Sequence, residues 1–311
     1  MRVAFLGTPD VAVPALRSLV AATDLEVAAV VTNPDRPKGR SRSLVAPPVK
    51  VAAQELGLEV WQPVKPAEVL DELAALELDA CAVVAYGALL PQRVLDVGGA
   101  GFVNLHFSLL PRWRGAAPVQ HALRAGDTVT GITTFVLDKG MDTGPVLDRV
   151  EVPIQPDESA GELLTRLAEL GGPVLVDSLR RLVAGEVPVP QPAEGATLAP
   201  KIEPDDVRID WTRPAREIKD LVRSAEPAPG AHTTFRGKRL KVRAVDVVEA
   251  DAASPGTVLE RTADGVVVAT AADALVLRRV QPEGKQAMDG AAFANGYRPD
   301  PGERLGADTA A

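Results

Sequence analysis

The most constraining feature of the sequence is a short strand-like run without a polar side chain on either face. Residues 27–31 read Val-Ala-Ala-Val-Val between Glu26 and Thr32. Successive side chains of a β-strand point to opposite faces of its sheet, so a wholly apolar strand must be covered on both faces. Three further, largely apolar runs repeat the pattern: residues 3–7, 80–85 and 101–105. Together they predict a parallel sheet with helices on both sides.

Helical patterns alternate with these strand candidates, as a doubly wound α/β sheet requires. The first helical stretch covers residues 10–20, with Asp10 as a suitable N-cap. Pro14 then falls in the first turn, where the missing amide hydrogen of proline is tolerated. Further helical patterns cover residues 48–56 and 67–76. We therefore predict the α/β class for this part of the chain.

The pattern changes near residue 185, where proline becomes frequent. Residues 186–204 contain five prolines, a composition typical of an extended, semi-rigid linker. After a helical segment at residues 214–224, short strand-like runs suggest a small barrel: residues 240–248, 256–260, 265–270 and 274–280. We therefore expect three parts: an α/β domain over residues 1–185, a proline-rich linker over residues 186–206, and a smaller β-barrel domain over residues 207–311.

Composition excludes several classes of protein. Apolar residues make up 46% of the 311 residues and charged residues 24%, as in ordinary soluble proteins. No stretch approaches the ~20 uncharged apolar residues of a membrane-spanning helix, so we expect no membrane partner. The single cysteine, Cys81, permits neither an intrachain disulfide nor a cysteine-based zinc cluster, and it fits a reducing cytoplasm. Because there are only three histidines as well, we expect no metal site.

The net charge of the whole chain and the local charge of two segments give opposite indications about a nucleic-acid partner. The whole-chain value of −8 disfavours one, but two local runs are strongly basic. Within residues 36–42 there are four cations and no acid: Arg36, Lys38, Arg40 and Arg42. Because the surrounding segment is rich in Pro, Gly and Ser, we expect a mobile, projecting loop that can contact phosphates. A solvated surface loop is the structural alternative.

The second basic run lies in the predicted barrel. Residues 236–243 hold five cations and no acid: Arg236, Lys238, Arg239, Lys241 and Arg243. Alternation along a strand would place Arg239, Lys241 and Arg243 on one face. Such a face could bind phosphates, or it could be an exposed strand protected by charge.

The densest polar cluster follows the strand candidate at residues 101–105. If Asn104 and His106 are both extended, their i, i+2 spacing points the amide and the imidazole to one face. Open α/β sheets bind ligands at the carboxyl ends of their strands. Two such groups could stabilise a developing oxyanion, and the imidazole could also move a proton. Alternatively, His106 is a hydrogen-bonded core histidine and Asn104 a turn residue.

A second polar cluster, residues 138–145, places two acids in a loop punctuated by glycine. Asp142 could orient a nearby imidazole and raise its pKa through its opposite charge. The alternative is a hairpin loop in which Asp138 and Asp142 serve only as turn residues.

These motifs resemble the folate-dependent formyltransferase family. The resemblance rests on Asn-Leu-His-Phe-Ser-Leu-Leu-Pro at residues 104–111, Arg114-Gly115 beyond it, and Gly-Met-Asp-Thr-Gly at residues 140–144. Other segments are similar to the members that formylate the methionine of initiator tRNA: residues 5–9, 34–40, 85–87, 90–91 and 209–211. The likeness extends from residue 1 to about residue 300.

The resemblance implies a Rossmann-like catalytic formyltransferase domain and a C-terminal OB-like barrel that binds tRNA. It implies transfer of the formyl group of 10-formyltetrahydrofolate to the methionine amino group of initiator methionyl-tRNA. The matching positions are Asn104, His106 and Asp142 for catalysis, Ser108, Leu109, Leu110 and Pro111 for folate, and the Arg36–Arg42 loop for tRNA. Tyr86 and Leu89 are further candidates for folate. Leu89, Leu90, Leu109 and Leu110 could give apolar surface to the pterin, or they could equally be core residues. We expect a cytoplasmic monomer.

In the expected mechanism, the free amine attacks the formyl carbon, and Asn104 and a protonated His106 stabilise the oxyanion. Asp142 keeps the imidazole charged, and the amine proton passes to the folate nitrogen. Phe135 and Ala228 differ from the residues that are usual at these positions in the family. We expect neither residue to take part in this chemistry.

Two other functions compete with this one. A formyltransferase for an amino-sugar nucleotide or for glycinamide ribonucleotide would share the same trio and folate site. A non-catalytic tRNA- or nucleotide-binding protein is the second alternative, although no G-x-G-x-x-G fingerprint follows the first strand.

Overall fold

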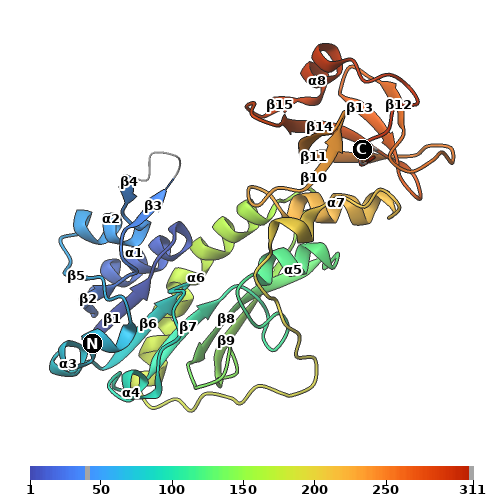
Figure 1. Cartoon of the computed structure of the whole chain (residues 1–311). Helices are drawn as coiled ribbons and strands as arrows, with labels where there is room; N and C mark the ends of the chain where they lie inside the picture. Colours follow the sequence, from blue (N-terminus) through green and yellow to red (C-terminus); the bar gives the residue numbers. More distant parts are fainter. Residues whose placement is uncertain (39–42, 308–311) are drawn as a thin grey trace. The chain divides into compact units, whose positions relative to one another are not determined.

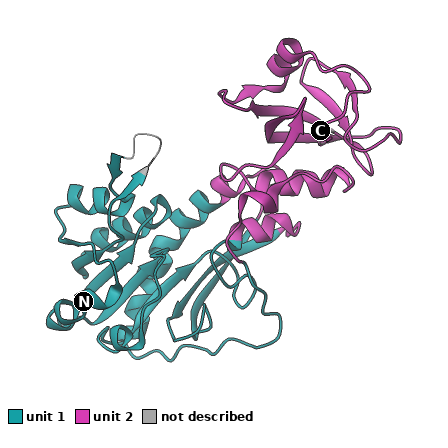
Figure 2. Cartoon of the chain, in the orientation of Figure 1, with its two compact units in different colours: residues 1–118, 129–153, 164–199 teal, residues 119–128, 154–163, 200–311 magenta. Residues whose placement is uncertain are grey.

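The computed structural model describes residues 1–38 and 43–307, which form two compact units (Figures 1 and 2). The first contains residues 1–118, 129–153 and 164–199. The second contains residues 200–311 together with two short segments, 119–128 and 154–163. Most of the proline-rich segment therefore groups with the first unit. No helix within the described ranges is long and apolar enough to cross a membrane.

The first unit is built on a mixed β-sheet. In order across the sheet, its strands are β5 (Val60–Trp61), β2 (Glu26–Val31), β1 (Arg2–Gly7), β6 (Ala80–Val84), β7 (Phe102–His106), β8 (Val129–Val136) and β9 (Val146–Pro153). The strands from β5 to β7 run parallel, which confirms the predicted α/β class. The strands β8 and β9 extend the sheet antiparallel and were not expected. The strand order departs in both directions from β1, as in Rossmann-like folds.

Helices cover both faces of this sheet, as the apolar strands require. They are α1 (Val13–Ala21), α2 (Pro48–Glu55), α3 (Leu70–Ala75), α4 (Gln92–Leu95) and α6 (Ala160–Val183). On one face, Leu6 of β1 and Val83 of β6 share a core cluster with Leu73 of α3 and Val94 of α4. On the other face, α6 lies against β7, where a side chain at Gly171 would collide with Leu105.

The first helix begins differently from the expectation. Asp10 does not cap it; Pro9 is the N-cap of a 3-10 turn at Asp10–Ala12, and α1 follows from Val13. Pro14 lies in the first turn of α1, as predicted. A second 3-10 turn, Pro66–Val69, precedes α3 and covers the start of the helical pattern expected at residues 67–76.

The basic segment after β2 contains a small hairpin. Strands β3 (Arg36–Lys38) and β4 (Ser43–Val45) pair antiparallel, so the two ends of the expected loop are short strands. Asp35, just before β3, forms an ion pair with Lys50 of α2, with 2.8 Å between Oδ1 and Nζ. The predicted tRNA-binding residues Arg40 and Arg42 lie outside the described residues.

The second unit carries an antiparallel sheet that curls into a half-barrel (Figure 1), as the sequence predicted. Its strands are β10 (His232–Phe235), β11 (Lys238–Val248), β14 (Ala274–Pro282), β13 (Val266–Ala269) and β12 (Val258–Arg261), with β15 (Met288–Asp289) paired to β14. Its helices are α5 (Pro118–Arg124), α7 (Ala215–Ser224) and α8 (Gly290–Tyr297), with a 3-10 turn at Pro204–Val207. Trp211, Phe235 and Phe293 anchor its core.

Candidate active site

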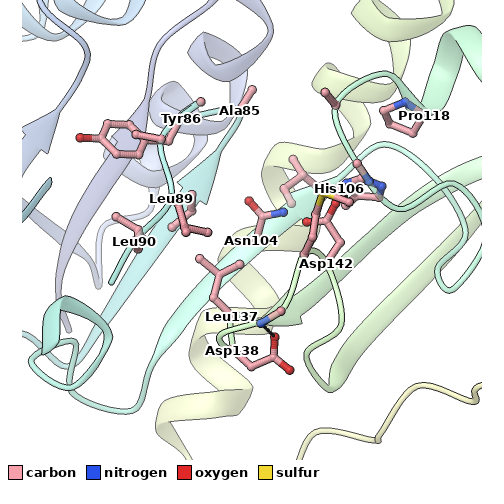
Figure 3. A pocket seen from close by; sticks show the side chains of 18 of the residues that line it. Ala85, Tyr86, Leu89, Leu90, Asn104, His106, Pro118, Leu137, Asp138 and Asp142 are labelled. Atoms are coloured by element: carbon pink, nitrogen blue, oxygen red, sulfur yellow. Dashed lines mark hydrogen bonds and ion pairs between the residues drawn. The ribbon is translucent and has the colours of Figure 1, made fainter. Parts of the chain in front are cut away.

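A pocket of about 530 Å³ opens at the carboxyl ends of β6 and β7, beside the point where the strand order reverses. Ligands bind to open α/β sheets at this position. The volume lies within the range of small-molecule sites. The pocket brings together three predicted residues, Asn104, His106 and Asp142 (Figure 3). Its apolar lining includes Leu89, Leu90, Leu95, Leu137 and Met141.

Asn104 and His106 both belong to strand β7, which is paired on both sides with β6 and β8. Their i, i+2 spacing directs both side chains into the pocket, so the shared face expected from the sequence is confirmed. Asn104 is therefore a strand residue rather than a turn residue. An amide N–H and an imidazole that enter one cavity can act on the same atom of a ligand.

The hydrogen bonds of His106 fix which ring nitrogen carries a proton in the neutral imidazole. Nε2 lies 2.9 Å from the carbonyl oxygen of Trp113, which can only accept, so Nε2 donates. Nδ1 then carries the lone pair, and it faces Asp142 with 3.7 Å to Oδ2. The neutral ring thus presents a basic nitrogen next to a carboxylate.

Burial decides the direction of the His106 pKa. The side chain is only 7% exposed, and this desolvation lowers the pKa below its ordinary value. The charge of Asp142 raises the pKa, as expected, and so does the hydrogen bond to the carbonyl of Trp113, but burial is the larger effect. Burial therefore opposes the expected protonated His106, and the mechanism that assigns it that role stays a prediction.

Phe135 contributes to that burial. Its ring, on β8, lies edge-on to His106 with 6.5 Å between ring centroids, and Phe135 itself is fully buried. Phe135 lies beside the site because β8 pairs directly with β7, and the expectation that it does not touch the chemistry stays a prediction. The sequence could not show it, since β8 was not predicted.

The two acids of the glycine-punctuated loop have different surroundings. Asp138 forms the turn, because its Oδ1 accepts hydrogen bonds from the Gly140 amide at 2.9 Å (dashed in Figure 3) and from the Thr143 hydroxyl at 2.7 Å. Asp142 faces His106 instead, and its Oδ2 accepts a hydrogen bond from the Gly115 amide at 2.7 Å. The turn alternative therefore applies to Asp138, and Asp142 remains available to the site.

The predicted folate residues separate into two groups. Tyr86, Leu89 and Leu90 line the pocket. Leu89 is 80% exposed, while the ring of Tyr86 is buried and points away from Asn104 (Figure 3); burial raises its pKa to about 12. The segment 108–111 does not line the pocket.

That segment, which holds Ser108, Leu109, Leu110 and Pro111, is anchored to β8. Thr133 donates its hydroxyl to the carbonyl of Ser108 at 2.7 Å and accepts the amide of Leu110 at 3.1 Å. The hydroxyl of Ser108 donates to the carbonyl of Arg112 at 2.7 Å. These bonds fix the conformation of the loop that carries Trp113. The segment therefore supports the pocket indirectly, through this loop.

The predicted tRNA residues of the barrel also differ among themselves. Lys238 and Arg239 are exposed at the start of β11. Lys241 donates to the carbonyl of Pro229 at 2.8 Å. Arg243 forms an ion pair with Glu226, with 2.6 Å between Nη2 and Oε1. Arg239 also donates from Nη2 to Nδ1 of His232 at 3.0 Å, so three of the four cations have partners inside their own unit.

Several residues at the site were not predicted from the sequence. Leu95 and Leu137 complete the apolar lining, and Gln191 and Thr197 of the proline-rich segment bind the loops around His106. No local pattern marks these two polar residues. Within residues 1–38 and 43–307, no group of three or more His, Cys, Asp and Glu side chains is placed to hold a metal ion.

Comparison with known proteins identifies the family. The chain matches the formyl transferase family over residues 1–179 and the formyl transferase C-terminal domain over residues 201–298. Methionyl-tRNA formyltransferase of Streptomyces coelicolor is 51% identical over 310 residues, which cover 98% of this chain and all of that relative.

Solved structures share the fold at low sequence identity. Methionyl-tRNA formyltransferase from Clostridium thermocellum has a TM-score of 0.58 at 17% identity, over 80% of this chain and 94% of that one. HypX from Aquifex aeolicus in complex with tetrahydrofolic acid has a TM-score of 0.65 at 18% identity, over 97% of this chain and 48% of that one. The chain thus spans about half the length of HypX. By its sequence relatives and both matched domains, it belongs to the formyl transferase family, among the methionyl-tRNA formyltransferases.

Proposed function

We propose that the chain transfers the formyl group of 10-formyltetrahydrofolate to the α-amino group of methionine on initiator methionyl-tRNA. The observation that carries the proposal is the convergence of Asn104, His106 and Asp142 in one pocket at the carboxyl edge of the sheet. The close relatives named methionyl-tRNA formyltransferase support the choice of acceptor. In the reaction, a C–N bond forms between the amine and the formyl carbon, and the bond from that carbon to the folate nitrogen breaks.

The pocket suits the folate end of the donor. Its volume of about 530 Å³ and its leucine-rich lining offer apolar surface to a flat ring system. Leu89 and Met141 are exposed at 80% and 57%, and both line the pocket, so a bound ring would cover apolar surface that is now in water. We propose that Tyr86 supports the pocket wall through its buried ring, and that residues 108–111 hold the loop behind it.

Asn104 is the proposed oxyanion donor. The attacking amine has a reference pKa of about 7.7–8.0, so a useful neutral fraction exists near neutral pH. Its attack turns the formyl oxygen into an oxyanion. The amide of Asn104 donates to that oxygen, and a donor held in place by strand β7 requires no reorganisation during the reaction.

His106 is the proposed proton carrier. Its neutral form leaves Nδ1 free to accept the proton that the amine loses after attack, because Nε2–H remains bound to the Trp113 carbonyl. Asp142 stabilises the imidazolium that results. The proton then passes to the folate nitrogen as its bond to the formyl carbon breaks. This sequence requires no metal and no covalent enzyme intermediate.

The basic runs are the proposed tRNA contacts. Arg36, Lys38, Arg40 and Arg42 would act on the first unit, and the exposed cations Lys238 and Arg239 at the start of β11 on the second. Phosphate contacts of this kind make binding weaken steeply with salt. Lys241 and Arg243 would contribute less, because they are half-buried and bind groups of their own unit. Since its acceptor is a charged tRNA and its trio comes from one chain, we propose a cytoplasmic monomer.

One assay tests the function against its competitors. The protein is incubated with 10-formyltetrahydrofolate and, in separate reactions, charged initiator tRNA, an amino-sugar nucleotide and glycinamide ribonucleotide. We expect formylmethionyl-tRNA as the only formylated product, with release of tetrahydrofolate. Formylation of either small acceptor with no reaction on tRNA would overturn the choice of acceptor, and binding of tRNA without formylation would support a non-catalytic protein.

A further inference from the structure

The two groups that face His106 come from residues with left-handed backbone conformations. Trp113, which supplies the carbonyl oxygen for Nε2, has φ +63°, and Asp142, which faces Nδ1, has φ +54°. Residues other than glycine persist in this region only where surrounding contacts hold them. Contacts from another segment can therefore hold both residues in place.

Gln191 of the proline-rich segment supplies one set of these contacts. Its Nε2 donates to the backbone oxygens of Asp142 at 2.9 Å and Gly144 at 2.8 Å. Its Oε1 accepts from the Arg114 guanidinium, at 3.2 Å from Nε and 2.7 Å from Nη2. One carboxamide thus joins the loop of Asp142 to the residue after Trp113.

Thr197 supplies the second set. Its hydroxyl accepts the backbone amide of Trp113 at 2.9 Å, and its carbonyl accepts the amide of Arg114 at 2.9 Å. Two residues further on, the backbone passes so close to Gly115 that a side chain there would lie 2.7 Å from the Ala199 oxygen. Gly115 is also the residue whose amide binds Asp142.

The sequence makes this segment a stiff support. Gln191 lies between Pro190 and Pro192, and a residue before proline is restricted to extended conformations. Less conformational freedom is therefore lost when its side chain is held between two loops. A flexible spacer could join two domains equally well, but it would not hold a carboxamide in one position.

We infer that the proline-rich segment is part of the active site, with Gln191 and Thr197 as positioning residues that hold Asp142 and Trp113 against His106. The inference rests on the proposed function, since it assigns these residues to the same formyl transfer. They act through Asp142 and Trp113, so their loss should lower kcat and leave substrate binding largely intact.

The experiment compares Gln191→Ala, Gln191→Glu and Thr197→Val with Thr197→Ser and with Glu194→Ala, an exposed control in the same segment. We expect kcat to fall about 10- to 100-fold in Gln191→Ala, as for small misplacements of catalytic groups, with both KM values within about twofold. Gln191→Glu keeps the acceptor for Arg114 but sets a carboxylate against two carbonyls, so it should not restore kcat. Thr197→Ser should retain the kcat that Thr197→Val loses.

A second measurement separates positioning from general support. NMR titration of His106 should show a lower pKa in Gln191→Ala than in the wild type, because the raising effect of Asp142 weakens when that loop shifts. A wild-type kcat in Gln191→Ala, full activity in Gln191→Glu, or an unchanged His106 pKa would each overturn the inference. Failure of the wild type itself to formylate tRNA would overturn the proposed function instead.

Discussion

Two predicted sites differ in what their polar side chains contact: the trio of Asn104, His106 and Asp142 on the first unit, and the basic strip on β11, which is the run of cations at residues 238–243. At the first, Asn104 and His106 of β7 and Asp142 of a later loop enter one pocket. At the second, Lys241 and Arg243 alternate with buried residues but bind groups of their own unit. Charge counted along a sequence therefore overstates the charge that a partner can reach.

The difference follows from where each set lies on its sheet. Residues at the carboxyl end of a parallel strand lie beside loops that return from other strands, and a cavity forms between them. A strand inside an antiparallel sheet has neighbours along its whole length, so long cationic side chains find acceptors there. Position on the sheet, more than residue type, separates a candidate catalytic group from a structural one.

The largest effect is expected from removing the proposed oxyanion donor. Asn104→Ala should lower kcat about 100- to 1,000-fold, because the amide acts on charge that develops only during the reaction. The folate KM should change little. Steady-state kinetics with charged initiator tRNA measure both, with the exposed Asn295→Ala as control. A kcat within about threefold of the wild type would remove Asn104 from the catalytic assignment.

Asp142→Asn tests the electrostatic half of the trio. Asn keeps an acceptor for the Gly115 amide but loses the charge that faces Nδ1. We expect kcat to fall about 10- to 100-fold as the imidazolium loses its partner. The pKa of His106 should drop further below its ordinary value, because burial then acts without the opposing carboxylate. NMR titration measures this pKa, with the His106 signal assigned from His106→Gln. The exposed Asp71→Asn on α3 is the control. A His106 pKa that rises would contradict this electrostatic account.

Arg243→Ala tests whether the basic strip is structural at its inner end. The ion pair with Glu226 has side chains only 20% and 21% exposed, and Arg243 also donates to Gln281 at 2.9 Å. Its loss should lower the free energy of unfolding by about 1–2 kcal/mol. Denaturant unfolding measures this, and Lys238→Ala should stay within about 0.5 kcal/mol of the wild type. Equal stability of the two variants would contradict the assignment of a structural role to Arg243 and not to Lys238.

Lys238→Ala should have the smallest effect, confined to tRNA. We expect its tRNA KM to rise about two- to threefold and the salt slope of binding to decrease by about 1, as for one lost phosphate contact. The folate KM should not change. Titrations over a salt series give the slope. An unchanged slope would argue that the exposed end of the strip does not meet phosphate.

Much of the fold followed from local patterns. The apolar runs at residues 3–7, 27–31 and 80–85 became β1, β2 and β6, and their coverage on both faces is confirmed. Strands β8 and β9 were not predicted: β8 contains a glycine and several threonines, and β9 is interrupted by the adjacent charged residues Asp148 and Arg149. The hairpin of β3 and β4 was missed because its composition is typical of a loop.

The sequence by itself determined the α/β sheet, the shared face of Asn104 and His106, and the family, because each depends on residues a few positions apart or on a contiguous motif. Only the tertiary structure decided that Asp142, rather than Asp138, faces the imidazole. It also decided that burial outweighs that carboxylate in the His106 pKa, and that Gln191 holds the loop of Asp142. These properties depend on desolvation and on partners dozens of residues apart, which the chain brings together only when it folds.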